Sequence, residues 1–237
     1  MRIDAIFFDV SGTLVRETPD EYACVAQWLR TLGYTISAQA QALLTARMKN
    51  AAYAQLMAEA NGAPRMDDAD FFAMLAGAAM QGIVPAGEQV QALGRSGEIC
   101  WQDKRMEPMD DAFDTLDALK ARGFRLGVVS NHRRTLPALL EAWGLAKYFE
   151  TIVVSEIEGI EKPDPAILHL AMERLSLEDA HRCLYVGDHP FDVLCAAKAG
   201  MRCAWLAEPG ERMPEGLDCR ADARIETLSD LLFLEIG

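Results

Sequence analysis

The chain of 237 residues lacks the features that would direct it into a membrane or out of the cell. No uninterrupted apolar run approaches the ~18 residues that a membrane-spanning helix needs. The opening stretch MRIDAIFFDV places an acidic residue directly before a strand-like pattern, which is not the layout of a secretory signal. The 6 cysteines include no CxxC pair. The sequence therefore predicts reduced thiols in the cytoplasm and neither a disulfide framework nor a zinc site.

Basic residues are also scarce. The 23 Lys and Arg residues stand against 36 Asp and Glu, which gives a formal net charge of −13. Nucleic acids are bound through Lys and Arg at the phosphates, so we expect no nucleic-acid partner, and we expect no membrane partner either. An anionic substrate would need a local cationic site to overcome this charge. Nothing in the sequence indicates an oligomeric state.

Two patterns of apolar residues succeed each other along the chain. Residues 3–8 form a short run rich in Ile and Phe, typical of a strand buried on both faces. From about residue 19 to 104 the spacing is helical, and after residue 106 strands and helices alternate. The helices predicted in the first block are 20–33, 37–62, 66–82 and 86–104. In the second block we expect strands at 124–131, 150–155, 182–188 and 202–206, and helices at 111–123, 133–144, 164–175, 190–200 and 227–236.

These patterns predict an α/β fold with a doubly wound parallel sheet. The sheet would be made by residues 1–16 and 106–237, because the first strand belongs to it. The four helices of residues 17–105 then form a domain inserted into the α/β core. Hinges are expected where the chain enters and leaves this insertion, at Val15–Pro19 and Lys104–Pro108.

Polar residues gather where the predicted strands end. In open parallel sheets, ligands bind beyond the carboxyl ends of the strands. Lys162, in the stretch GIEKPDPAIL, stands just before a helix whose entrance suits Pro163 and Pro165. The residues that follow the strands are Asp9, Ser11, Gly12 and Thr13, then Ser130 and Asn131, then Asp188 and Asp192. Acids, hydroxyls and a lysine are thus expected to meet at one edge of the sheet.

These residue types suit phosphoryl transfer. A carboxylate can attack phosphorus and form an acyl phosphate. Lysine, serine and backbone N–H groups can hold the phosphoryl oxygens. The remaining acids can hold Mg²⁺, which prefers oxygen ligands, and without such a cation neighbouring carboxylates would repel one another. The sequence therefore predicts Mg²⁺ as cofactor and a small phosphorylated molecule as substrate.

The stretches DVSGTL, VVSN, EKPDP and VGDHPFD occur in this order, and together they resemble the motifs of the haloacid dehalogenase (HAD) superfamily, whose members are mostly phosphatases. The resemblance covers essentially the whole α/β part, and the insertion resembles the family's helical cap. It implies Asp9 as the nucleophile and Ser130 and Lys162 as ligands of the phosphoryl group. Gly12, Thr13 and Asn131, in the turns after the first two predicted strands, would be substrate-binding residues. It also implies that Mg²⁺ is held by Asp9, the backbone carbonyl of Ser11 and Asp188, with Asp192 as a nearby ligand that acts from behind these residues or through a water molecule.

Ser11 departs from the usual phosphatase pattern, which has aspartate two places after the nucleophile. That aspartate protonates the leaving oxygen and later activates water, and a serine hydroxyl is a far weaker acid. General acid–base catalysis is typically worth ~10²–10⁴ in rate. We therefore expect acyl and aryl phosphates to be cleaved better than alkyl phosphates. Some phosphatase branches of the superfamily do carry serine at this position.

Three functions compete at this point: a phosphatase for good leaving groups or with another acid, a carbon-centred hydrolase, and a protein that binds a phosphorylated ligand without turnover. The dehalogenase branch acts without a metal, which the acids in GDHPFD count against. The phosphonatase branch uses a cap lysine, and Lys49 lies in a comparable place, although its surroundings RMKNAAY do not match that branch.

Structural roles compete with some of these assignments. Asp192 could cap the helix that follows it. Thr13 is expected to bond within its own turn and Asn131 to shape the turn after its strand, while His189 is expected to fill a loop.

Overall fold

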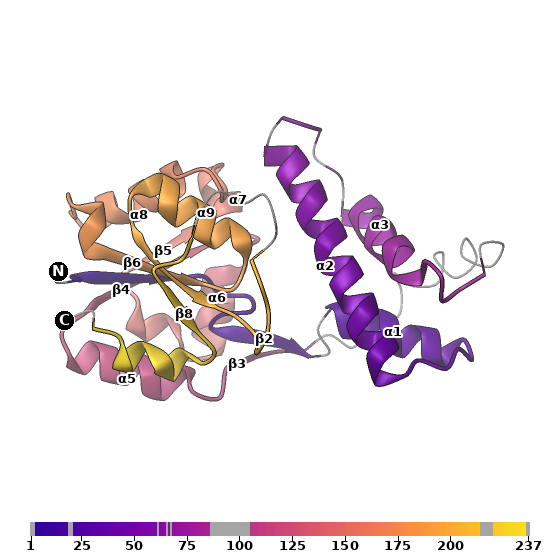
Figure 1. Cartoon of the computed structure of the whole chain (residues 1–237). Helices are drawn as coiled ribbons and strands as arrows, with labels where there is room; N and C mark the ends of the chain where they lie inside the picture. The colour runs from indigo at the N-terminus through magenta and orange to yellow at the C-terminus, as the bar shows by residue number, and fades with distance from the viewer. Residues whose placement is uncertain are drawn as a thin grey trace. The chain divides into compact units, whose positions relative to one another are not determined.

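The computed structural model describes residues 3–18, 21–60, 62–64, 66, 68–85, 105–213 and 220–235 (Figure 1). The chain divides into two compact units. One contains residues 1–16 and 107–237, and the other contains residues 17–106. Among the described helices, none has both the length and the apolar character needed to cross a bilayer.

The first unit is built on a six-stranded sheet with the order β5-β4-β1-β6-β7-β8, in which each strand runs parallel to its neighbours. Its strands are β1 (Ala5–Phe8), β4 (Arg125–Ser130), β5 (Thr151–Val154), β6 (Cys183–Gly187), β7 (Arg202–Leu206) and β8 (Ala223–Ile225). From β1 the chain builds outwards to β4 and β5 on one side and to β6, β7 and β8 on the other. The predicted parallel α/β sheet is confirmed, and β1 is its topological switch point.

The central strands explain why the sequence folds in this way. All four residues of β1 are buried, as a strand covered on both faces requires. Phe7 aligns with Gly127 on β4 and with Tyr185 on β6. A Cβ atom on Gly127 would lie 2.7 Å from Cδ1 of Phe7. The glycine therefore leaves room for the aromatic ring of the central strand.

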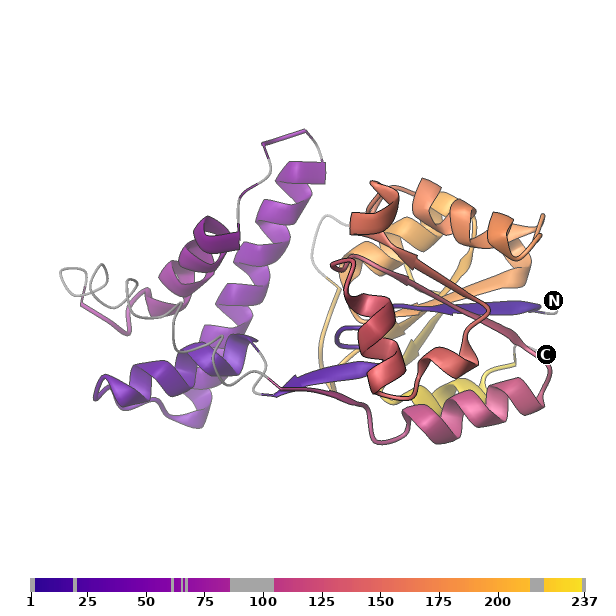
Figure 2. The same cartoon turned by 180° about the vertical axis from the view of Figure 1, so that it is seen from behind.

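Helices cover both faces of the sheet, as Figures 1 and 2 show. The α-helices are α5 (Ala112–Ala121), α6 (Leu136–Ala142), α7 (Ser155–Glu158), α8 (Ala166–Arg174) and α9 (Pro190–Ala199). Short 3-10 helices are η1 (Ala146–Tyr148), η2 (Ala180–Arg182) and η3 (Leu228–Phe233). Helices α8 and α9 pack on one face and share a buried apolar cluster with β1, β4 and β6, while α5 and η3 cover the other face.

The C-terminal part differs from the prediction in two ways. The helix predicted over 227–236 is the 3-10 helix η3, whose start is capped by reciprocal hydrogen bonds between Thr227 and Asp230. Short helical segments of this kind often adopt the tighter 3-10 geometry. Strand β8 was not predicted, because only Ile225 of its three residues is buried and so no apolar run marks it.

The second unit is helical, with α1 (Glu21–Thr31), α2 (Ala38–Ala60) and α3 (Asp68–Met80) close to the predicted positions. Its core is one apolar cluster that includes Trp28, Leu44, Met48, Leu75 and Met80. The fourth predicted helix, over 86–104, lies outside the described residues.

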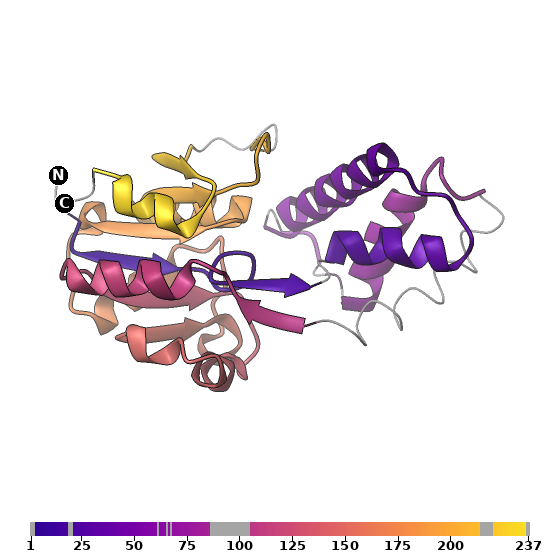
Figure 3. The same cartoon turned by 90° about the horizontal axis from the view of Figure 1, so that it is seen from below.

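The predicted hinge segments contain regular strands. Strand β2 (Val15–Thr18) pairs with β3 (Arg105–Pro108) in a two-stranded sheet, which Figure 3 shows from below. Arg16 Nε lies 2.8 Å from Glu107 Oε1, and the Arg16 guanidinium donates two hydrogen bonds to Asp110, at 3.0 and 2.9 Å. These bonds raise the pKa of Arg16 and lower the pKa of Asp110. The sequence did not reveal this pairing, because its partners lie 91 and 94 residues apart.

Candidate active site

Three neighbouring strands end side by side at β1, the topological switch point of the sheet. Asp9 follows the central strand β1, Ser130 is the last residue of β4, and Asp188 follows β6. Because β4 and β6 flank β1 and all three strands are parallel, these residues lie at one edge of the sheet. Open α/β sheets bind their ligands at such an edge.

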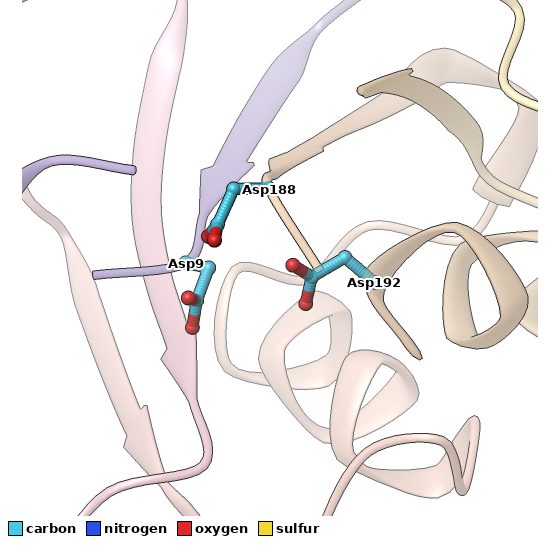
Figure 4. Close-up of side chains that lie close together, drawn as sticks. All are labelled: Asp9, Asp188 and Asp192. Atoms are coloured by element: carbon cyan, nitrogen blue, oxygen red, sulfur yellow. The ribbon is translucent and has the colours of Figure 1, made fainter. Parts of the chain in front are cut away.

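Three aspartates form an acidic cluster at this edge. Carboxylate oxygens of Asp9, Asp188 and Asp192 all lie within 4.8 Å of one another. Figure 4 shows the three side chains converging, with Asp192 reaching in from the first turn of α9. Asp9 and Asp192 are 6% and 0% exposed, and Asp188 is half-buried. The predicted convergence of these acids therefore occurs in the structure.

Lys162 lies between two of these acids. Its Nζ donates to Asp9 Oδ1 at 2.7 Å, to Asp192 Oδ1 at 2.6 Å and to the hydroxyl of Tyr185 at 3.0 Å. The side chain is almost fully buried. Burial acts to lower the pKa of Lys162, but the carboxylates of Asp192 and Asp9 outweigh it and raise that pKa above its ordinary value. The lysine is therefore a buried ammonium ion with all three of its hydrogens bonded.

One ammonium does not neutralise three carboxylates. Burial raises the pKa of Asp188 well above its ordinary range, and the neighbouring Asp9 and Asp192 add to the shift, while the hydrogen bond from Thr13 opposes it. Burial also raises the pKa of Asp192 to about 6, although Lys162 acts in the opposite direction. Crowded carboxylates shift in this way when each disfavours the charge on the next. The cluster carries unbalanced negative charge that a cation would relieve.

The donor set fits Mg²⁺, which takes oxygen ligands and is usually bound through one or two carboxylates. Asp9 and Asp188 have oxygens available for such an ion. Both oxygens of Asp192 already accept hydrogen bonds, Oδ1 from Lys162 Nζ and Oδ2 from the backbone N–H of His189 at 2.9 Å. Asp192 therefore supports Lys162 and caps α9, together with His189, whose Nδ1 accepts from the N–H of Phe191 at 3.1 Å.

The turn after β1 carries three more of the predicted residues. The backbone N–H of Thr13 donates within the turn to the carbonyl of Val10 at 3.2 Å, as expected, whereas its Oγ1 donates to Asp188 Oδ1 at 2.9 Å. Gly12 has φ +78°, and a Cβ atom there would lie 2.3 Å from Asp188 Oδ2. Ser11 is half-buried and forms an isolated bridge with Val15. The turn thus packs directly against Asp188, and this packing requires glycine at position 12.

The residues after β4 have different surroundings. Ser130 is 1% exposed, and its hydroxyl has no hydrogen bond to any described residue. Asn131 is exposed, but its side-chain amide bonds to the main chain of Lys162. The amide of Asn131 therefore holds the loop of Lys162 in place, which agrees with a role in shaping the turn. Both of its polar atoms already have a hydrogen-bond partner in the main chain of Lys162.

Sequence reasoning missed two polar contributors to the site. The hydroxyl of Tyr185 donates to the carbonyl of Val129 at 2.7 Å and accepts from Lys162. The indole Nε1 of Trp205 donates to the carbonyl of Asp188 at 2.8 Å. A signal was present, since each is a polar aromatic residue inside a strand expected to be buried. Such residues usually find a hydrogen-bond partner when buried.

Comparisons with known proteins agree with this geometry. The family model for haloacid dehalogenase-like hydrolases matches residues 3–200. Phosphoglycolate phosphatase of Escherichia coli (strain K12) is 30% identical over 252 residues, covering 97% of this chain and 91% of that protein. Pyrophosphatase PpaX of Bacillus pumilus is 35% identical over 124 residues, covering 52% and 57% of the two chains. The magnesium-bound structure of the putative HAD-hydrolase YfnB from Bacillus subtilis superposes with a TM-score of 0.67 at 20% identity, covering 98% of each chain, and supports the fold alone.

Proposed function

Because this chain belongs to the haloacid dehalogenase-like hydrolases, and is therefore a hydrolase, we propose that it is a Mg²⁺-dependent phosphatase that cleaves a small phosphorylated metabolite through an aspartyl-phosphate on Asp9. The observation that carries the proposal is the buried Lys162 ammonium, which bridges Asp9 and Asp192 beside Asp188. This arrangement offers a carboxylate nucleophile, a cation for phosphoryl oxygens and an oxygen-donor site within one small cluster.

Asp9 has the geometry of an oriented nucleophile. Its Oδ1 is held by Lys162 at 2.7 Å, and Oδ2 accepts no hydrogen bond from the described residues. In the proposed reaction, an Asp9 oxygen forms a bond to phosphorus while the bond from phosphorus to the leaving oxygen breaks. Water then attacks the acyl phosphate, releases inorganic phosphate and restores the carboxylate.

Lys162 and Ser130 would hold the phosphoryl oxygens, since one is a buried cation and the other a buried hydroxyl at the adjacent strand end. Asp9, Asp188 and the backbone carbonyl of Ser11 would hold Mg²⁺. When bound, the ion supplies positive charge that offsets both the carboxylates and the phosphoryl group. Asp192 keeps the ammonium in place throughout, because its two oxygens hold Lys162 and the start of α9.

The relatives support a phosphorylated substrate. Their names specify phosphoglycolate and pyrophosphate as the compounds that those proteins cleave. For this chain we propose small phosphorylated metabolites as the substrate class and name no single compound. Ser11 lacks the acidity to protonate an alkoxide, so the preferred substrates would have good leaving groups. The helical unit of residues 17–106, which enters the sequence directly after the first motif, would act as the cap that selects among them.

The cell compartment we propose is the cytoplasm. Cys183 and Cys195 are buried free thiols. Thiols persist in this state in a reducing compartment.

The test is a screen of alkyl phosphates, acyl phosphates, pyrophosphate, phosphonoacetaldehyde and 2-haloacids, each with Mg²⁺ and with EDTA. We expect Mg²⁺-dependent phosphate release. Asp9→Asn should abolish it without unfolding the protein, and Asp117→Asn, a matched change on the exposed face of α5, should not. Full turnover in Asp9→Asn would reject Asp9 as the nucleophile.

Ser11 also favours a second candidate, a carbon-centred hydrolase, because the serine removes the acid that phosphatases normally use. Halide release from 2-haloacids in EDTA, with no phosphate release in Mg²⁺, would establish that candidate. Silence across all substrates would favour a protein that binds a phosphorylated ligand.

A further inference from the structure

The hydroxyl of Tyr185 is the third partner of the Lys162 ammonium and, unlike the carboxylates of Asp9 and Asp192, it is neutral. Tyr185 lies on β6 and is fully buried. Its oxygen is 3.0 Å from Lys162 Nζ and 2.7 Å from the carbonyl oxygen of Val129 on β4. Tyr185 thus reaches from β6 to β4, the strands on either side of β1, and touches the lysine that contacts Asp9.

The directions of these bonds follow from their chemistry. A carbonyl oxygen can only accept, so the phenol proton of Tyr185 points to Val129. The phenol oxygen then presents a lone pair to Lys162, which has three N–H donors and no acceptor. The other two donors go to Asp9 and Asp192. Each hydrogen of the ammonium therefore has one acceptor, and rotation about the Cε–Nζ bond is fixed.

Packing alone does not require the hydroxyl. Phe7, on the neighbouring strand, fills an equivalent place in the same row of the sheet without one. Burying a hydroxyl is unfavourable unless it is hydrogen-bonded, so a phenylalanine would suit a purely apolar role at position 185. Strand β4, which Tyr185 contacts at Val129, ends at the next residue, Ser130, which is the second residue expected at the phosphoryl group.

We propose that Tyr185 is a positioning residue for Lys162. Its hydroxyl holds the ammonium so that one N–H faces Asp9, and it links that ammonium to the end of β4. The catalytic consequence depends on the proposed phosphatase function, whereas the effect on Lys162 depends only on the contacts of Tyr185. Without the hydroxyl, the ammonium keeps its two carboxylate acceptors but has no acceptor for its third N–H. The ammonium can then rotate about the Cε–Nζ bond, and the carboxylate of Asp9 is no longer held in one orientation.

The experiment compares Tyr185→Phe with Tyr148→Phe. Tyr148 is also buried in the first unit and lies in η1, where its ring contacts Phe113. Removing a hydrogen bond to a buried charge lowers activity by about tenfold to a hundredfold. We expect this loss in kcat for Tyr185→Phe, with KM changed by less than about threefold, and a change within about twofold for Tyr148→Phe. Urea unfolding of both variants controls for loss of stability.

A second readout does not need activity. The exchange of the Lys162 ammonium protons with water, followed by nitrogen-15 NMR and assigned with Lys162→Met, should be about tenfold faster in Tyr185→Phe and unchanged in Tyr148→Phe. If the unaltered protein hydrolyses no phosphate, the proposed function fails and the exchange rates decide the positioning role. Unchanged exchange in Tyr185→Phe, or equal losses of kcat in both variants, would overturn the proposal.

Discussion

The side-chain amide of Asn131 forms hydrogen bonds with both the N–H and the carbonyl of Lys162. Nδ2 donates to the Lys162 carbonyl at 2.9 Å, and Oδ1 accepts from the Lys162 N–H at 2.8 Å. The two residues are 31 positions apart, and their bonds join the loop after β4 to the loop before α8. Asn131 thereby fixes the backbone of the lysine whose ammonium holds Asp9.

Removing this amide should loosen the lysine loop. Asn131→Ala is expected to lower the free energy of unfolding by about 1 kcal/mol, since its two hydrogen bonds can be replaced in part by water. We expect kcat/KM to fall by about tenfold because the backbone of Lys162 loses its fixed position. The measurements are urea unfolding and steady-state phosphate release. Asn50→Ala on the exposed side of α2 is the control, and equal activity in Asn131→Ala and Asn50→Ala would contradict the role.

Ser11 should set the preference for leaving groups. In the unaltered protein, acetyl phosphate should be cleaved better than a sugar phosphate, whose alkoxide needs a proton. Ser11→Asp should raise kcat for the sugar phosphate, by up to about 10²-fold, because it supplies a general acid. Ser11→Asn has the same size without the acidic proton and should give no gain. Vigorous hydrolysis of sugar phosphates by the unaltered protein would show that another group donates the proton.

Gly12 should be needed for the position of Asp188. A Cβ atom at Gly12 would meet Asp188 Oδ2 at 2.3 Å, whereas Gly144, with a similar positive φ of +74°, has nothing within 4 Å of its Cβ position. Alanine at either position costs about 1 kcal/mol of backbone strain. Only Gly12→Ala should also weaken Mg²⁺ binding, by at least about tenfold, as measured by calorimetric titration. Equal Mg²⁺ affinities in the two variants would disprove this steric role.

The acidic cluster should make stability depend on pH and on metal. Burial raises the pKa of Asp188 well above its usual range and that of Asp192 to about 6. The folded protein then holds these protons more tightly than the unfolded chain, whose aspartates titrate near ~3.9. Their contribution to stability is therefore present below about pH 4 and is lost as pH rises through about 6 and beyond.

Mg²⁺ held by Asp9 and Asp188 would displace the proton of Asp188, so it should raise the melting temperature more at pH 8 than at pH 5. The check is a thermal melt at both pH values, with Mg²⁺ and with EDTA. Asp188→Asn should remove most of the difference, and Asp117→Asn should leave it intact. An equal stabilisation at both pH values would show that the ion does not bind at this cluster.

The sequence by itself determined the α/β class and most of the elements. The spacing of apolar residues and the polar residues at strand ends are local properties of the sequence. For this reason β1, β4, β6 and the helices beside them were predicted near their observed positions. The order of the four motifs placed Asp9, Ser130, Lys162 and Asp188 at one edge of the sheet, because parallel strands present their carboxyl ends together.

Only the tertiary structure decided which atoms meet there. Thr13 and Asp188 are 175 residues apart and Lys162 and Asp9 are 153 apart, and no sequence period connects such pairs. Strand order brought Tyr185 and Trp205 to the site, although each looked like a core residue of its own strand. Burial in the assembled cluster also fixed the charges, because desolvation and neighbouring carboxylates act only once the chain has folded.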